Sequence, residues 1–310
     1  MYALVRMEPD ELFSSWLARA ALRAGCSPLT LTSLIWPDWR PWTVDIDRGI
    51  PQERVRQLSR ATGIDAARLE LAMLDRVIAG LNPAGRAPRT TALWLLARGG
   101  RNRRTRGGLG FCAVCLTDDR AAYFRRHWRL AWHTACEHHA SILADRCPRC
   151  VAPVAPHRCD VDGGGIARCH ACDFDLRGTP VAMADSDALA FQVQADRVLA
   201  EGIGVWPDRS TIDSPAWFAA ARRLARRSLH QLEAHLGVLA PPAMGLALEL
   251  QSVQERHMRF AVVGKRLNVG LLAPLFGHPS KAVEVTADDM HIKAQLAWRR
   301  FLRRRGVAPS

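Results

Sequence analysis

The chain has 310 residues and a formal net charge of +13, and 40 of its 43 basic residues are arginine. This length allows two or three domains, and arginine, whose planar fork binds phosphate oxygens, favours an anionic partner. Six of the nine cysteines fall in C-x-x-C pairs, which excludes the disulfide framework of a small secreted protein. With no basic, apolar leader at the start and no bilayer-length apolar run, we predict a cytoplasmic protein without a membrane partner.

Residues 1 to about 85 predict an N-terminal helical region. Apolar residues recur at helical spacing from Leu12 to Ala24, and Ser27-Pro28 is typical of the start of a second helix. Two further helices are predicted between Pro51 and Leu74, on either side of Thr62-Gly63 and with Asp65 as a candidate N-cap. This pattern is typical of a helix-turn-helix, although many helical hairpins that do not read bases share it.

An arginine-rich segment follows. Between Arg86 and Arg129 the chain has eleven arginines and two acids, and the densest part runs from Arg98 to Arg106. Glycines at positions 85, 107 and 108 flank a short helix that we predict around Thr91 to Ala97. Such sequence is typical of a solvated linker and is equally suited to contacts with phosphate groups.

Four short turns in the middle of the chain are its most specific feature. They are Cys112-x-x-Cys115, Cys136-x-x-His139, Cys147-x-x-Cys150 and Cys169-x-x-Cys172. Two intervening residues let both side chains converge on one tetrahedral ion, and two such turns complete a closed site. We therefore predict two structural Zn²⁺ ions and no catalytic residue, because a closed site has no coordination position for water or substrate.

Four nearby side chains compete with this assignment. His138 lies beside His139, but only His139 gives the two-residue spacing of the other turns. His157, Cys159 and His170 lie among ligand sets that are already complete, so we expect them to be spare, although Cys159 could compete for a position.

Trp128, Leu130 and Trp132 alternate with other residues between the two halves of the first site. This period of two predicts a β-strand and is typical of a zinc ribbon. We expect both tryptophans to pack in a core under the metal rather than to stack on bases.

Residues from about 181 onward predict a second helical region. Its helices are expected around Ala188–Leu199, from Pro215, around Leu246–Phe260 and around Met290–Leu302, and two basic clusters lie on them. Like-charged side chains at i, i+4 repel one another, which favours an anionic partner, although a solvated helix face is the ordinary alternative. The candidate nucleic-acid-binding residues are Arg98, Arg101, Arg103, Arg104, Arg106, Arg222, Arg226, Arg303 and Arg304.

These patterns predict a mainly α-helical protein with small zinc-ribbon modules of mixed α and β structure. The expected domains are an N-terminal helical domain with a helix-turn-helix-like element (residues 1–108), a tandem zinc-binding module (109–180) and a C-terminal helical domain (181–310).

The motifs also resemble a known family. Residues 11–19 (ELFSSWLAR), the turn F-C-x-x-C-L at 111–116, the run WRLAW at 128–132, and the turns at Cys136 and Cys147 resemble the TniQ family in order and spacing over roughly residues 8 to 176. TniQ proteins and the related TnsD target selectors are transposition accessory proteins. The resemblance implies that Cys112, Cys115, Cys136 and His139 hold one zinc ion and Cys147, Cys150, Cys169 and Cys172 the other.

The resemblance further implies a non-enzymatic adaptor in the nucleoid that binds DNA and recruits an AAA+ ATPase and a transposase for target-site selection. It leaves open the target site, a guide-RNA effector complex as a partner, and a homodimer. Two other functions stay open on the residues alone. One is a zinc-ribbon transcriptional regulator; the other is a nuclease or hydrolase with His138 as base, against which stands the lack of a carboxylate cluster for a second metal.

Overall fold

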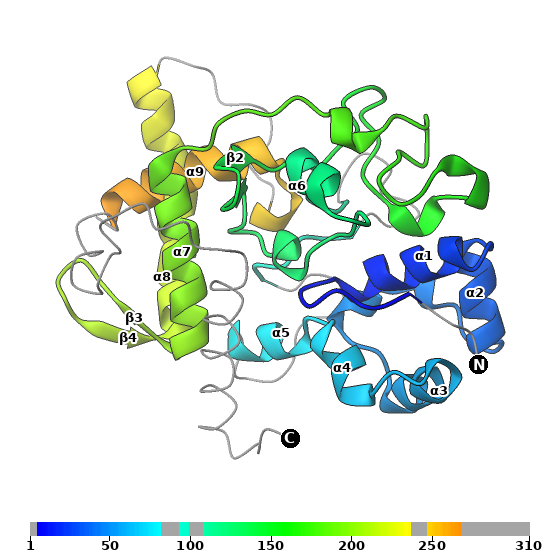
Figure 1. Cartoon of the computed structure of the whole chain (residues 1–310). Helices are drawn as coiled ribbons and strands as arrows, with labels where there is room; N and C mark the ends of the chain where they lie inside the picture. Colours follow the sequence, from blue (N-terminus) through cyan, green and yellow to red (C-terminus); the bar gives the residue numbers. More distant parts are fainter. Residues whose placement is uncertain (1–4, 82–92, 99–107, 237–246, 268–310) are drawn as a thin grey trace. The chain divides into compact units, whose positions relative to one another are not determined.

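The computed structural model describes residues 5–81, 93–98, 108–236 and 247–267 (Figure 1). The contacts divide the chain into two compact units. Unit 1 comprises Met1–Ala79, Gly85–Ala184 and Ala243–His257, and unit 2 comprises Gly80–Ala84, Asp185–Pro242 and Met258–Ser310. Helices dominate the described residues and the strands among them are two or three residues long, which confirms the predicted fold class.

The N-terminal part of unit 1 consists of short helices around one apolar core. They are α1 (Phe13–Arg23), α2 (Pro28–Ile35), the 3-10 turns η1 (Pro41–Thr43) and η2 (Ile46–Arg48), α3 (Gln52–Thr62), α4 (Ala66–Leu71) and α5 (Asp75–Leu81). The core includes Trp16, Leu31, Trp36 and Leu58, all at most 1% exposed. As predicted, Ser27 caps α2, since its side chain accepts a hydrogen bond from the Thr30 N–H at 3.2 Å.

The turn between α3 and α4 follows the expected pattern with one difference. Gly63 ends α3 in the left-handed conformation at φ +73°, which glycine adopts without steric cost. Asp65 stands at the N-cap of α4 as predicted, although its side chain makes no capping hydrogen bond. The helix α4 has six residues, with Leu69 buried against α3 and α1.

The metal-binding segment of unit 1 is built largely from turns. Its elements are α6 (Ala113–Asp118), η3 (Arg126–Arg129), β1 (Ala135–Cys136), β2 (Ser141–Ile142), η4 (Pro156–Arg158), η5 (Val161–Gly163) and η6 (Leu176–Gly178). The strands β1 and β2 pair antiparallel, with Cys136 opposite Ser141. The backbone at 182–184 continues this small sheet, because Ile142 N–H donates to Ala182 O and Ala184 N–H donates to Ala140 O, each at 2.8 Å.

A buried arginine joins the N-terminal helices to the metal-binding segment. The Arg129 guanidinium is 1% exposed; it binds Asp45 at 2.6 Å and Asp47 at 2.7 Å. Asp47 also accepts hydrogen bonds from the backbone N–H and the hydroxyl of Ser14 at the start of α1. A buried charge is tolerable only when it is paired and hydrogen-bonded, so these contacts fix both parts in one unit.

Residues 247–257 complete unit 1 from much later in the chain. The buried carboxylate of Glu249, in η7 (Leu248–Leu250), accepts a hydrogen bond from the Trp94 N–H at 2.6 Å. The fully buried Arg256, in α9 (Val253–Arg266), donates to the carbonyl of Ala131. Burial lowers the pKa of Arg256 to about 10.

Unit 2 is a helical unit with one short hairpin. It contains α7 (Ser186–Glu201), β3 (Ile203–Val205), β4 (Thr211–Asp213), α8 (Ser214–Leu236) and the last residues of α9. In its core Phe191 stacks on Phe260 with ring centroids 4.7 Å apart, and on Trp217 at 5.7 Å. The strands β3 and β4 pair antiparallel and lead directly into α8, where Pro215 occupies the first turn as predicted.

Three segments differ from the sequence expectation. Residues 126–129 form a 3-10 turn instead of the predicted strand. Trp128, Arg129 and Trp132 are all buried, so buried and exposed side chains do not alternate here as they would in a strand with one solvent-exposed face. Residues 93–98 form a turn and an isolated bridge from Leu95 to Leu130 instead of a helix. The helix expected from Leu246 begins later, since Ser252 and Glu255 exchange the reciprocal hydrogen bonds of a capping box. The expected helix Met290–Leu302 lies outside the described residues.

Candidate metal centres

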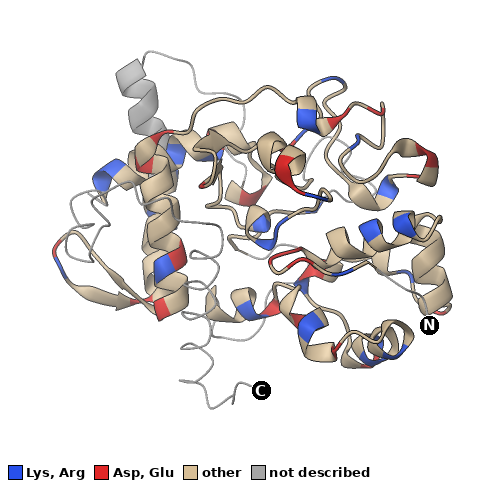
Figure 2. Ribbon diagram, in the orientation of Figure 1, with Lys and Arg blue, Asp and Glu red and all other residues tan. Residues whose placement is uncertain are grey.

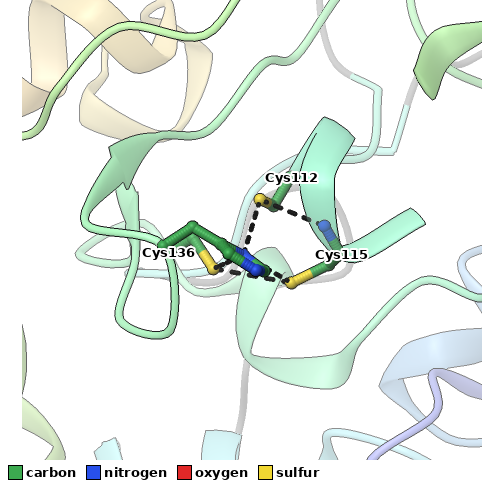
Figure 3. Close-up of side chains that lie close together, drawn as sticks. Cys112, Cys115 and Cys136 are labelled. Atoms are coloured by element: carbon green, nitrogen blue, oxygen red, sulfur yellow. Dashed lines mark hydrogen bonds between the residues drawn. The ribbon is translucent and has the colours of Figure 1, made fainter. Parts of the chain in front are cut away.

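The first centre lies between the start of α6 and the turn that joins β1 to β2. Cys112 is the N-cap of α6, and its Sγ accepts a hydrogen bond from the Cys115 N–H at 3.5 Å, so the C-x-x-C turn is the first turn of a helix. Cys136 ends β1, and His139 follows in the tight turn before β2. Figure 3 shows the thiol groups of Cys112, Cys115 and Cys136 pointing toward one another.

The distances among these side chains fit a tetrahedral ion. The His139 Nδ1 lies 3.5 Å from the Cys112 Sγ and 3.4 Å from the sulfurs of both Cys115 and Cys136. The Cys115 and Cys136 sulfurs are 3.5 Å apart. Zinc–sulfur and zinc–nitrogen bonds of about 2.3 and 2.0 Å place tetrahedral ligands about 3.5 Å (sulfur to nitrogen) to 3.8 Å (sulfur to sulfur) from one another. Three thiolates and one imidazole are therefore in position to enclose one Zn²⁺.

Asp118 orients the histidine of this centre. Its Oδ2 lies 3.2 Å from the Nε2 of His139, on the side of the ring away from the thiols. A hydrogen bond from Nε2–H to the carboxylate leaves Nδ1 as the unprotonated, metal-binding nitrogen. In the sequence Asp118 is one of only two acids in an arginine-rich segment; its place one turn after a C-x-x-C on a helix was the available signal for this role.

The second centre consists of two turns of the same construction. In the first turn, the Val151 N–H donates to Cys147 O and the Cys147 N–H donates to Ala152 O. In the other turn, the Asp173 N–H donates to Cys169 O and the Cys169 N–H donates to Phe174 O. Val151 and Asp173 both have positive φ, at +60° and +59°. Each backbone thus folds back beneath its own pair of thiols.

The four thiols of the second centre also converge. Cys147 and Cys172 sulfurs are 3.6 Å apart, as are those of Cys150 and Cys169, and all four lie within 4.8 Å of one another. This spacing again fits a tetrahedral ion. The two centres differ in exposure: the cysteines of the first are 2–3% exposed, whereas Cys150 is exposed and Cys172 is half-buried.

The competing side chains lie apart from both ligand sets. Cys159 is buried and its Sγ donates to the carbonyl of Arg168 at 3.5 Å. His157 stacks on Trp42, and His138 is exposed with its ring centroid 6.4 Å from that of His139. Trp128 and Trp132 are at most 1% exposed, which confirms that they belong to the core.

The candidate nucleic-acid-binding arginines have different surroundings. Arg98 is half-buried, and its Nη2 donates to the carbonyls of Trp42 and Val44. On α8, Arg226 is exposed and Arg222 is half-buried. Figure 2 shows basic and acidic residues interspersed over much of the described ribbon. Arg101, Arg103, Arg104, Arg106, Arg303 and Arg304 lie outside the described residues.

Comparison with known proteins agrees with the resemblance noted in the sequence. No curated protein shows significant similarity to the chain. Among the described helices, none has the length and apolar character needed to cross a bilayer. The family model described as TniQ matches residues 3–143, which include the N-terminal helices and all four ligands of the first centre. This match covers just under half of the chain and supports a TniQ family transposition protein.

Proposed function

We propose that this chain is a non-enzymatic adaptor that selects target sites for transposition. In this role it binds DNA, or a complex that has already found a target, and recruits an AAA+ ATPase and the transposase. The observation that carries the proposal is the TniQ match over residues 3–143, because TniQ proteins are non-catalytic accessory factors. A cytoplasmic, nucleoid-associated location follows from the same role.

The two metal centres support an architectural role for zinc. Each set offers four protein ligands, so a bound Zn²⁺ has no position left for water or substrate and supplies folding energy instead of chemistry. The described turns around the centres contain little regular structure that could hold them without the ion. Cys112, Cys115, Cys136 and His139 would bind one ion, and Cys147, Cys150, Cys169 and Cys172 the second.

The positive charge of the chain supports DNA binding. Arg222 and Arg226 lie one helical turn apart on α8, where neutralising phosphates would release counterions and give affinity that falls steeply with salt. The sequence blocks at Arg101–Arg106 and Arg303–Arg304 would add to the same effect. Contacts of this kind position a protein on DNA without reading its sequence. Target choice would then rest on α3 and α4 or on a partner.

A reconstitution tests this function. The purified chain is mixed with labelled DNA and with the AAA+ ATPase of the same transposon. We expect salt-dependent DNA binding by the chain, and we expect the ATPase to reach target DNA only when the chain is present. A chain that binds one promoter specifically, and neither binds nor alters the ATPase, would support a transcriptional regulator instead.

A further inference from the structure

Trp42 packs where the N-terminal helices meet the second metal module. Its Nε1 donates to Pro28 O at 3.1 Å and to Thr32 Oγ1 at 3.0 Å, so α2 fixes the indole in place. The ring stacks on the imidazole of His157 with centroids 5.2 Å apart and planes 12° apart. The guanidinium carbon of Arg98 lies 5.6 Å from the centroid of the same ring. We call Trp42, Arg98, His157 and Arg158 the Trp42 seam.

The seam carries donors that no protein group uses. The Nη1 of Arg98 is buried, and in the described part of the chain it has no hydrogen-bond partner. Arg158 is exposed, and its side chain makes no hydrogen bond or ion pair with any described residue. Burial, and then the charges of Arg98, Arg158 and His170, lower the pKa of His157 to about 3, so its imidazole is neutral and offers one N–H.

The acids near the seam are already engaged. Asp45 and Asp47 act on Arg98, but both carboxylates bind the buried guanidinium of Arg129. Asp160, two positions after Arg158, is exposed and accepts a hydrogen bond from the Val161 N–H at 2.8 Å, but it forms no ion pair with Arg158. No carboxylate is among the charges that act on His157. Arg158 therefore stands without a carboxylate partner among the described residues, beside a flat aromatic surface.

A lone exposed arginine is ordinarily solvated and needs no ligand. The seam differs because donors from two separate chain segments, the chain at residue 98 and η4, lie beside one indole that α2 holds in place. A phosphate group accepts several hydrogen bonds and carries negative charge, so it would accept from Arg158 and from the N–H of His157, and the charge of Arg98 would add to the attraction.

We propose that the Trp42 seam binds a backbone phosphate of DNA, an inference that rests on the proposed DNA-binding function. Arg158 and His157 donate to the phosphate oxygens, while Arg98 behind them adds positive potential. Such an interaction fixes the register of the second metal module on the duplex and carries no sequence information itself.

The test compares two arginines of the same module in the full-length chain. Arg158→Gln removes the seam cation, and Arg177→Gln removes a cation that already pairs with Asp175 at 2.6 Å. Both variants lower the net charge equally. Binding to a fluorescent DNA duplex is measured between about 50 and 200 mM salt. The slope of log affinity against log salt should shrink by about 0.9 when one phosphate is no longer neutralised by the protein.

We expect the smaller slope, and a severalfold weaker affinity, for Arg158→Gln alone. Arg158→Lys should keep most of the slope, because a point charge still neutralises a phosphate. Unchanged thermal unfolding of both Gln variants shows that folding is not the cause. Equal slopes for Arg158→Gln and Arg177→Gln would overturn the seam as a phosphate site while the DNA-binding function stands. Absence of DNA binding by the unmodified chain would overturn the proposed function and the seam together.

Discussion

Single side chains outside the ligand sets decide how the first metal centre and the core of unit 1 are held. Asp118 orients His139 from outside the first ligand set, and Arg129 neutralises two buried carboxylates that come from a loop more than 80 positions earlier in the chain. The position of Asp118 one turn after a C-x-x-C is a local signal in the sequence, whereas the pairing of Arg129 leaves none. The C-x-x-C and C-x-x-H turns are local and therefore predictable, whereas the partner of Arg129 depends on how distant segments pack.

Removing the carboxylate of Asp118 should weaken the first centre without destroying it. In Asp118→Asn the Nε2–H of His139 loses its charged acceptor, and the affinity of the centre for zinc should fall about 10- to 100-fold. Competition with a chromophoric chelator measures this. Asp162→Asn, an exposed aspartate of the second module, is the matched control and should leave both affinities unchanged. Equal zinc affinities of the two variants would show that Asp118 does not support the first centre.

Replacing Arg129 should strongly destabilise unit 1. Burial raises the pKa of Asp47 even with Arg129 beside it, so Arg129→Met leaves a carboxylate that must either stay charged without a partner or take up a proton. We expect a loss of about 3–5 kcal/mol of unfolding free energy in chemical denaturation. The exposed Arg56–Glu53 pair is the control, and Arg56→Met should leave the stability nearly unchanged.

Helices were easier to predict than the turns around them. The spacing of Phe13, Trp16 and Leu17 and the Ser27-Pro28 start act within one helix, so α1 and α2 follow from local sequence. The alternation at Trp128, Leu130 and Trp132 did not correspond to a strand. This segment is buried on all sides, so its apolar residues do not mark one buried face opposite an exposed one. The hairpin of β3 and β4 has three residues per strand, too few to show a period.

Two helices of unit 2, α7 and α9, approach each other closely at Gly264. A Cβ at this position of α9 would lie 2.2 Å from the carbonyl oxygen of Asp187 in α7. Helix propensity alone favours Gly264→Ala by about 1 kcal/mol, whereas the clash with backbone costs about 1–3 kcal/mol. We expect net destabilisation in thermal unfolding, with Lys265→Ala as a neutral control in the same turn. A stabilised Gly264→Ala would show that α7 and α9 do not touch there.

The whole molecule combines a matched family segment with parts beyond it. Residues 3–143 hold the first centre but not the second, so the turns at Cys147–Cys172 and the parts of unit 2 from Asp185 onward lie outside that match. The tandem arrangement nevertheless places both centres within unit 1, and their unequal exposure makes them distinguishable in one experiment.

Zinc should leave the two centres at different rates. The second centre exposes Cys150, whereas the cysteines of the first are at most 3% exposed, so a chelator reaches the second first. We expect two phases of release in stopped-flow or mixing experiments with a chromophoric chelator. Cys150→Ser should abolish the fast phase and leave one ion per chain. A single phase carrying both ions would mean that the centres open together.

The position of residues 247–257 has a consequence for synthesis of the chain. Glu249 and Arg256 occupy buried sites in unit 1, yet the ribosome makes them only after most of unit 2. Until they emerge, the Trp94 N–H and the Ala131 carbonyl lack these partners. A fragment that stops after the second metal module would therefore keep every zinc ligand and still lack part of its core, so the smallest stable version of unit 1 must include this late segment.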